Sequence, residues 1–439
     1  MSGKTILVWF RNDLRIHDNE ILFEAARKAG KVLPVYCFDP FYFKTTSSGL
    51  QKTGNIRARF LLESVADLRE NLRKLGSELI VRTGNPAEVI LQLAQQYQVS
   101  EVYHHREVAF EETEISEAVE TALWKIRLNL KHFIGHTLYH KEDLPFPIKD
   151  IPDSFATFRK KVERDSGVRP CIETLKYIET PGIADAGDIP SLADLGLAEH
   201  HIDPRADFVY QGGETSALEQ MHQYIDHLQP VPKNSKHVSE NPSRLSAWIS
   251  MGCLSQRMVY HEMMKHTNGT HASGSPLILE LLWRDYFRFM FKKYGKQFFN
   301  AEGFKSEAPE QADNQNELFE QWKNGRTGEP FIDAAMHELN ATGYISNYKR
   351  QVVAACLVNA IKADWTKGAA YFEEKLIDYS PASNWGNWAF VAGVANDTRD
   401  NRYFTGVKQA DNPETESGFI STWLPEIDDS SSLVAVGPV

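Results

Sequence analysis

The sequence predicts an α/β fold with an N-terminal doubly wound parallel sheet and a C-terminal all-helical domain. The first 140 residues alternate short apolar runs with amphipathic helical patterns, whereas the pattern from residue 215 onward is helical. Because parallel strands require crossover helices, this alternation is typical of a doubly wound sheet. A chain of 439 residues exceeds one ordinary core, so two domains are expected. The expected boundaries are 1–140 for the α/β domain, 141–214 for a connector and 215–439 for the helical domain.

Four buried strands are expected in the α/β domain. Their apolar runs are TILVWF (5–10), VLPVYCF (32–38), LIVR (79–82) and EVYHH (101–105). The amphipathic segments 56–76 and 86–98 lie between them and predict helices. The first strand runs into WFRNDLRIHD, which contains no GxGxxG fingerprint. A dinucleotide is therefore not expected to bind at this turn in the Rossmann manner.

The expected connector differs in composition from both flanking regions. Residues 141–214 contain seven prolines with glycines between them and little sustained periodicity. Such a segment is expected to be irregular and to lie on the surface. The helical patterns that follow are joined by short segments rich in Gly and Asn.

Bulk composition excludes several classes of protein. Hydrophobic content of 42% and charged content of 24% are typical of a globular chain. The four cysteines are far apart and form no CxxC pair, so neither a zinc site nor a disulfide framework is expected. No signal-peptide layout and no long apolar stretch is present. We therefore expect a cytoplasmic, metal-free protein that does not enter membranes. The net charge of −11 argues mildly against nucleic acid, although a local basic patch is compatible with it.

A first candidate site lies in ENPSRLSAWISMG (240–252). Asn241 precedes Pro242, the pattern of a helix cap followed by proline at the first helical position. Ser243, Arg244 and Ser246 then surround a predicted helix start, where free N–H groups favour a phosphate. A capped helix that binds nothing is the common alternative.

A second candidate lies in LELLWRDYFRF (279–289), which places Glu280, Trp283, Arg284 and Phe287 on one helical face. A carboxylate and an indole on one face suit a cavity for a flat, hydrogen-bonding ligand. The alternative is a Glu280–Arg284 surface pair beside core aromatics.

Two further segments of the helical half carry unusual polar groups. NYKRQ (347–351) puts Asn347, Arg350 and Gln351 on one face, which suits a ring carbonyl or diphosphate; ordinary surface polarity is the alternative. Asp378 precedes SNWGNWAF (383–390), which holds two tryptophans and Asn384. A packed helix start would also explain the tryptophans. The co-occurrence of these signals in one helical domain favours a binding site.

The chain resembles the photolyase/cryptochrome family of flavoproteins, and most closely its DASH-type cryptochromes. The resemblance rests on long, ordered motifs: VWFRNDLRIHDN, TGNIRARFLLESVADLR, HREV, SRLSAWISMGCLS, ELLWRDYFRF, GRTGEPFIDAAM, ELNATGYISNYKRQ, IDYSPASNWGNWAFVAGVANDTRDNRYF and KQADNPETESGFISTWLPEI. It implies an α/β domain, a long connector and a helical domain that binds FAD. It also implies that an electron from photoexcited reduced flavin splits a cyclobutane pyrimidine dimer in DNA and then returns.

The resemblance also assigns roles to residues. The FAD contacts that it implies are Ser243, Arg244, Leu245, Ser246, Arg284, Asn347, Arg350, Asp378, Ser380 and Asn384, with Asn384 facing the reactive ring nitrogen. The dimer and DNA contacts that it implies are Glu280, Trp283, Asn347, Tyr348, Gln351, Phe390, Arg399 and Arg402. Trp388 matches the tryptophan nearest the flavin and Trp365 the next electron carrier. The third carrier of the family has no tryptophan counterpart, and its position falls at Ala312 if the register is ungapped.

Departures from the family pattern refine the expected function. Phe390 stands where photolyases for duplex DNA carry a second stacking tryptophan, and Gln351 stands where they carry a methionine. Both imply a less apolar dimer pocket and a preference for single-stranded DNA. Ser380 replaces an acid, and Pro242 a threonine. A blue-light sensor without repair activity and a duplex-DNA photolyase are the alternative functions.

An antenna cofactor and the assembly state complete the expectations. DASH-type relatives often carry methenyltetrahydrofolate between their domains, and HREVAFEET (105–113) resembles the folate-contacting segment. Glu112 is the expected partner of the pterin, although a solvated glutamate would explain it equally well. The protein is expected to act as a monomer.

Overall fold

The computed structural model describes residues 4–228, 242–266, 275–305, 307–395 and 413–424. The chain forms two compact units. The first comprises residues 1–44, 58–199 and 210–295, and the second comprises 45–57, 200–209 and 296–439. The domain boundaries expected after residues 140 and 214 stay a prediction.

The first unit is built on a five-stranded parallel sheet. Its strands, in spatial order, are β3 (Ile80–Thr83), β2 (Lys31–Phe38), β1 (Thr5–Phe10), β4 (Glu101–His105) and β5 (Leu130–Phe133). In register, Thr5 lies opposite Lys31, and Ile6 lies opposite Glu101. The chain thus moves outward from β1 through β2 and β3, then returns to the other side of β1 with β4. The sheet is doubly wound, as the sequence predicted, and its switch point lies between the carboxyl ends of β1 and β4.

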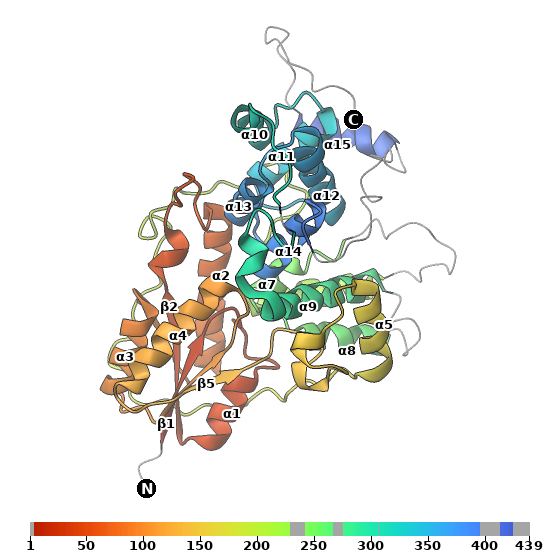
Figure 1. Cartoon of the computed structure of the whole chain (residues 1–439). Helices are drawn as coiled ribbons and strands as arrows, with labels where there is room; N and C mark the ends of the chain where they lie inside the picture. The colour runs from red at the N-terminus through yellow and green to blue at the C-terminus, as the bar shows by residue number, and fades with distance from the viewer. Residues whose placement is uncertain (1–3, 229–241, 267–274, 306, 396–412, 425–439) are drawn as a thin grey trace. The chain divides into compact units, whose positions relative to one another are not determined.

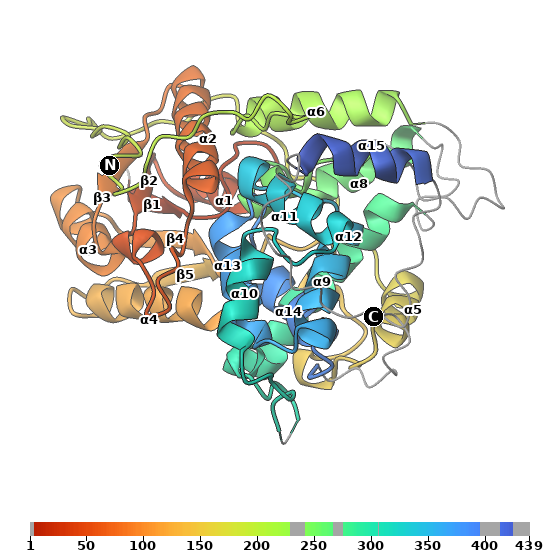
Figure 2. The same cartoon turned by 90° about the horizontal axis from the view of Figure 1, so that it is seen from above.

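The core of this unit follows from strands that are almost wholly apolar. Leu7 and Trp9 alternate with Ile6 and Val8, so successive side chains enter opposite faces of the sheet. Leu7 and Trp9 join one cluster with the apolar residues of α3 and α4, two helices that lie side by side (Figures 1 and 2). Covering both faces with helices is what buries continuous Val/Ile/Leu strands.

The elements of the first unit are β1 (Thr5–Phe10), α1 (Glu20–Lys28), β2 (Lys31–Phe38), η1 (Pro40–Phe43), α2 (Asn55–Lys74, whose first turn falls in the second unit), β3 (Ile80–Thr83), α3 (Pro86–Gln96), β4 (Glu101–His105), α4 (Phe110–Trp124), β5 (Leu130–Phe133), η2 (Lys141–Asp143), η3 (Ile148–Asp150), α5 (Phe155–Asp165), α6 (Glu214–Asp226), α7 (Ser246–Ser250), α8 (Gln256–His266) and α9 (Pro276–Tyr294). β1 and β4 have the predicted bounds. The sequence analysis missed β5 and α5.

The second unit is helical. Its elements are η5 (Gly295–Phe299), α10 (Gln315–Lys323), α11 (Pro330–Thr342), α12 (Asn347–Ala355), the π-helical turn η6 (Cys356–Ala360), α13 (Trp365–Lys375), α14 (Pro381–Val391) and α15 (Pro413–Trp423). α13 packs against α14, and α11 packs against α15. Residues 45–57 belong to this unit because they bind α13: Lys52 pairs with Glu373 at 3.0 Å, and the Gly54 amide donates to the Glu374 carbonyl at 3.0 Å.

Within the described ranges, no helix is both long enough and apolar enough to cross a bilayer. The same residues contain no group of three or more His, Cys, Asp or Glu side chains arranged to hold a metal ion.

Candidate functional site

The helical unit joins two of the predicted flavin residues directly. Arg350 lies in the first turns of α12, which Ser346 caps by accepting from the Lys349 amide. The Arg350 guanidinium donates from Nε to the Ile345 carbonyl at 2.9 Å and from Nη2 to Asp378 Oδ2 at 2.8 Å. The second Asp378 oxygen, Oδ1, is buried and has no hydrogen-bond partner among the described residues. That part of the chain thus leaves an acceptor available to a donor from a ligand.

α14 presents the next pair of predicted residues. Ser380 is its N-cap residue and Pro381 its first residue, the position where a missing N–H costs nothing. Asn384 lies one turn later, is 7% exposed, and donates from Nδ2 to the Ala369 carbonyl at 2.9 Å. This bond fixes the amide, so that its carbonyl oxygen is held in a set direction.

These residues fit FAD. A flavin ring carries an N–H donor and carbonyl acceptors along one edge. The unpartnered Asp378 Oδ1 would accept that donor, and a buried acceptor left without one costs free energy. Arg350 can serve a carbonyl or phosphate while it holds Asp378. When bound, FAD would supply the photochemistry; these side chains would bind and orient it.

The two predicted electron carriers of the helical unit lie in separate aromatic groups. Trp388 lies against Trp322, with ring centroids 6.2 Å apart, and against Phe372 at 5.1 Å. Trp365, the predicted next carrier, instead contacts Trp385 at 5.9 Å and donates its indole N–H to the Ala301 carbonyl. The ring contacts of the described residues include no direct Trp388–Trp365 pair. The step from Trp388 to Trp365 stays a prediction.

The predicted DNA contacts of this unit lie at its surface. Tyr348 is 46% exposed. Asn347 and Gln351 are also exposed, and Phe390 is partly buried. Arg399 and Arg402 lie outside the described residues.

The predicted phosphate cradle of the first unit has a different backbone from the one expected. The helix begins at Ser246 rather than at Pro242 and is only five residues long. Arg244 has a φ of 56°, a left-handed conformation that no helix accepts. The expectation of a helix N-terminus formed by residues 242–246 was therefore wrong, and Asn241 lies outside the described residues. Ser243 and Arg244 are partly buried, Leu245 is buried and Ser246 is exposed.

α9 carries the other predicted residues of the first unit. Glu280 is exposed. Trp283 stacks on Phe155 with centroids 3.6 Å apart and an interplanar angle of 11°, so one face of the indole is covered by a side chain from α5. Arg284 donates to the carbonyls of His136, at 2.5 Å, and Ile249, at 3.4 Å. Arg284 thereby connects α9 to α7 and to the loop that follows β5, a structural role that was not predicted from the sequence.

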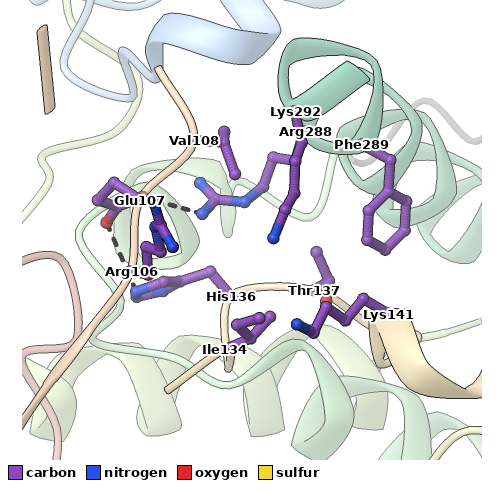
Figure 3. Close-up of a pocket in the computed structure, with 10 residues that line it drawn as sticks. All are labelled: Arg106, Glu107, Val108, Ile134, His136, Thr137, Lys141, Arg288, Phe289 and Lys292. Carbon is purple, nitrogen blue, oxygen red and sulfur yellow. Dashed lines mark hydrogen bonds and ion pairs between the residues drawn. The ribbon is translucent and has the colours of Figure 1, made fainter. Parts of the chain in front are cut away.

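A pocket in the first unit lies beside the switch point of the sheet (Figure 3). Its empty volume is about 380 Å³, part of it open to solvent. The lining comes from the segments after β4 and β5 and from α9: Arg106, Glu107, Val108, Ile134, His136, Thr137, Lys141, Arg288, Phe289 and Lys292. Ligands of doubly wound sheets bind at this end of the strands.

The pocket is lined by one carboxylate, Glu107, and by four cationic side chains, Arg106, Lys141, Arg288 and Lys292. Glu107 accepts from Arg288 at 2.9 Å and from Asn12 at 3.0 Å, and His136 lies 3.5 Å away. Burial would raise the pKa of Glu107, but interactions with His136, Arg288 and Arg11 outweigh it and lower that pKa. Burial, with repulsion from Lys141, Arg106 and Arg288, lowers the pKa of Lys292. Four Lys and Arg side chains against one carboxylate leave the pocket with a net positive charge, which suits an anionic ligand.

Glu112, the predicted pterin partner, does not line this pocket. Its carboxylate accepts from the Ala109 amide at 3.2 Å, as the third residue of α4 commonly does. Burial, and then the charge of Glu107, raise the pKa of Glu112 to about 8. The role of Glu112 toward a pterin stays a prediction. Glu107 lines the pocket, and the HREV motif containing it was visible in the sequence.

A doubly wound α/β unit and a helical unit whose Arg350–Asp378 cluster would fit a flavin are typical of a two-part flavoprotein. Family models agree with this: the model for DNA photolyase matches residues 6–176, and the model for the FAD-binding domain of DNA photolyase matches residues 277–438. The chain belongs to the photolyase/cryptochrome family. The resemblance inferred from the motifs, and the expected FAD-binding domain, are thereby confirmed.

Individual relatives place it close to the DASH-type cryptochromes. Cryptochrome DASH of Gloeobacter violaceus is 43% identical over 97% of this chain and 87% of the relative, and that of Xenopus laevis is 41% identical over 97% and 84%. The crystal structure of a Synechocystis sp. cryptochrome matches with a TM-score of 0.89 at 40% identity, covering 97% of this chain and 89% of that one. An archaeal photolyase from Sulfolobus tokodaii, described with two FAD molecules, matches with a TM-score of 0.75 at 25% identity, covering 97% and 91%.

Proposed function

We propose that this protein repairs cyclobutane pyrimidine dimers by a blue-light-driven electron transfer from reduced FAD, preferentially in single-stranded DNA. The observation that carries the proposal is the flavin-binding cluster of Arg350, Asp378 and Asn384, with its unpartnered buried acceptor Asp378 Oδ1. Membership of the photolyase/cryptochrome family supports the same reading. Reduced FAD, when bound, supplies the electron.

The chain's own residues would position the reactants and exclude water. Arg350 and Asp378 hold one edge of the ring, and Asn384 presents a fixed amide to it. Glu280 is an exposed carboxylate, which can accept the N–H of a thymine base. Asn347, Tyr348 and Gln351 are exposed at the start of α12, where they can meet a DNA strand. Phe390 and Gln351 support single-strand preference because they offer less apolar surface to a flipped dimer.

The test is illumination of the chemically reduced protein with dimer-containing oligonucleotides, single-stranded in one arm and double-stranded in the other. Repair of the single strand well above the duplex is expected. Equal repair of both would overturn the strand preference. Repair of neither, by protein that retains FAD, would favour the blue-light sensor.

We further propose methenyltetrahydrofolate as an antenna in the pocket of the first unit, which Glu107 lines. The cationic lining formed by Arg106, Lys141 and Lys292 supports this proposal, since folates carry carboxylates. The test is equilibrium binding of methenyltetrahydrofolate, with FAD in a parallel arm. Exclusive uptake of FAD at this pocket would replace the folate with a second flavin. We also propose that the protein acts as a cytoplasmic monomer, which sedimentation and cell fractionation test.

A further inference from the structure

Three redox-active side chains of the helical unit form a continuous series of ring contacts. The centroids of Trp388 and Trp322 are 6.2 Å apart at an interplanar angle of 78°. Those of Trp322 and Tyr371 are 5.9 Å apart at 64°. At these separations and angles the ring edges meet, and electron tunnelling is fast between aromatic rings in contact.

The surroundings of Trp322 suit an intermediate carrier. Its side chain is fully buried, and its indole N–H donates to the Val353 carbonyl at 2.9 Å. A peptide carbonyl is a poor proton acceptor, so an indole that has lost an electron here stays a radical cation. In that form it remains a strong oxidant for a neighbour.

Tyr371 has what Trp322 lacks, a route for its proton. The Tyr371 hydroxyl contacts Asn340 Oδ1 and lies 3.1 Å from the Lys323 carbonyl. Asn340 and Lys323 are both partly exposed, so a proton released at the hydroxyl reaches solvent at this edge. Burial raises the pKa of Tyr371, and the resting side chain is therefore a neutral phenol.

The route that the family resemblance implied does not share these contacts. Trp365 contacts the ring of Trp385, and Trp385 contacts Phe299 at 4.8 Å. Residues 307–321 contain no tryptophan that could continue the series. Among the described residues, Trp388 therefore contacts Trp322 directly, whereas Trp365 contacts Trp385 instead.

We propose that Trp388, Trp322 and Tyr371 form a branch of the electron relay, with Tyr371 as its terminal donor; this rests on the proposed flavin site beside Trp388. An electron lost from Trp388 to photoexcited oxidised flavin is replaced from Trp322. The Trp322 radical cation is then reduced by Tyr371, whose O–H bond breaks as the electron leaves and the proton passes to Asn340 and solvent. An external thiol returns one electron and one proton to the tyrosyl radical.

The experiment is flash photolysis of the FAD-loaded full chain, with the radical identified by electron paramagnetic resonance and its formation timed in H₂O and D₂O. A tyrosyl signal that forms more slowly in D₂O is expected, because the phenolic proton moves with the electron. Tyr371→Phe, which removes one oxygen and keeps the ring, should abolish that signal. Trp322→Phe should abolish it too, while Trp385→Phe, in the other aromatic group, should leave it unchanged.

Three results would overturn the branch: no tyrosyl radical in the wild type, its persistence in Tyr371→Phe, or its loss in Trp385→Phe alone. FAD content and the thermal midpoint identify a variant that has merely lost its fold. If Trp322→Phe proves to be unfolded, Tyr371→Phe still decides the test. Dimer repair by chemically reduced protein should be the same in wild type and Tyr371→Phe. Failure of repair in both would count against the proposed function, whereas the radical signal reports on the branch alone.

Discussion

Arg350 binds only one of the two carboxylate oxygens of Asp378. Nη2 of the guanidinium lies 2.8 Å from Oδ2, while Oδ1 is buried and has no partner in the part of the chain that the structure describes. Buried polar atoms in native proteins are almost always hydrogen-bonded. The free oxygen is therefore the strongest structural indication of where a ligand donor belongs.

Replacing Asp378 by Asn should weaken FAD binding while the fold survives. The amide keeps the shape of the side chain but loses the charge that pairs with Arg350. A loss of about 1–3 kcal/mol is expected, the cost of one unmatched buried polar group. Equilibrium dialysis of FAD measures it. The matched control is Glu310→Gln, which removes a carboxylate from an exposed pair with Lys362; such pairs contribute little. Equal FAD affinity in Asp378→Asn and wild type would remove Asp378 from the site.

Gly368 is expected to be intolerant of a side chain because Trp388 packs on it. A Cβ at this position would lie 2.4 Å from Trp388 Cη2 and 2.5 Å from a Leu357 methyl group. Gly368→Ala should therefore displace the indole and destabilise the protein by about 1–3 kcal/mol, the usual cost of overpacking. Denaturant unfolding measures the change. Gly418→Ala is the control, since a Cβ there meets nothing within 4 Å and Ala favours a helix. A stable Gly368→Ala protein would show that the contact is loose.

Glu112 should make stability depend on pH. Its pKa is raised from 4.5 to about 8 by burial and by the charge of Glu107. Between these values the native state holds a proton that the unfolded state has released. Stability from this group is therefore complete below about pH 4.5 and is lost as the pH rises toward 8.

Glu112→Gln tests that dependence directly. The amide can still accept from the Ala109 amide, but it does not titrate, so the loss of stability between pH 5 and about 8 should be smaller than in the wild type. Thermal midpoints across this range measure it. Glu117→Gln, at an exposed position of the same helix, is the control. Parallel pH curves for wild type and Glu112→Gln would contradict the assignment.

Charge in the pocket should govern antenna binding. Lys292 lines the pocket beside Lys141, Arg106 and Arg288, so Lys292→Glu should weaken methenyltetrahydrofolate binding, and added salt should weaken the wild-type affinity as well. Fluorescence titration of the folate measures both effects. Lys160→Glu makes the same charge change at an exposed position of α5 outside the lining. If both variants bound folate equally, the cationic lining would be irrelevant to the ligand.

The sequence predicted the sheet well because its strands are buried on both faces. β1 is an almost continuous apolar run, and β4 is a short segment whose last four residues are all buried. Short buried segments between amphipathic helical patterns are typical of parallel strands. β5 was missed because LKHF exposes Lys131 and has only two buried residues. α5 was missed among prolines, although Phe155, Phe158 and Val162 are spaced as one buried helical face. That signal was present and could have been used.

Parts of the site depended on geometry that no local pattern carries. The left-handed conformation of Arg244 delays α7 by four residues relative to the expected start, and a non-glycine residue gives no warning of it. The pocket combines three segments that are far apart in the sequence. The partnership of Trp388 with Trp322 likewise joins α14 to α10. The Arg350–Asp378 cluster was easier to predict from the sequence because each residue lies in a distinctive motif.

Glu280 should affect repair without affecting the fold. The sequence suggested a buried carboxylate, but Glu280 is exposed on α9. Truncation there leaves no cavity, so Glu280→Ala should change stability by no more than about 0.5 kcal/mol. If its carboxylate accepts the N–H of the damaged base, Glu280→Ala should lose about 1–3 kcal/mol of interaction free energy with the dimer, and repair should fall accordingly. Repair per absorbed photon measures the loss, and FAD content and unfolding serve as internal checks. Glu262→Ala, at a partly exposed carboxylate on α8 that pairs with Lys265, should repair normally. Loss of FAD in Glu280→Ala would make the residue structural, and unchanged repair would remove it from the dimer site.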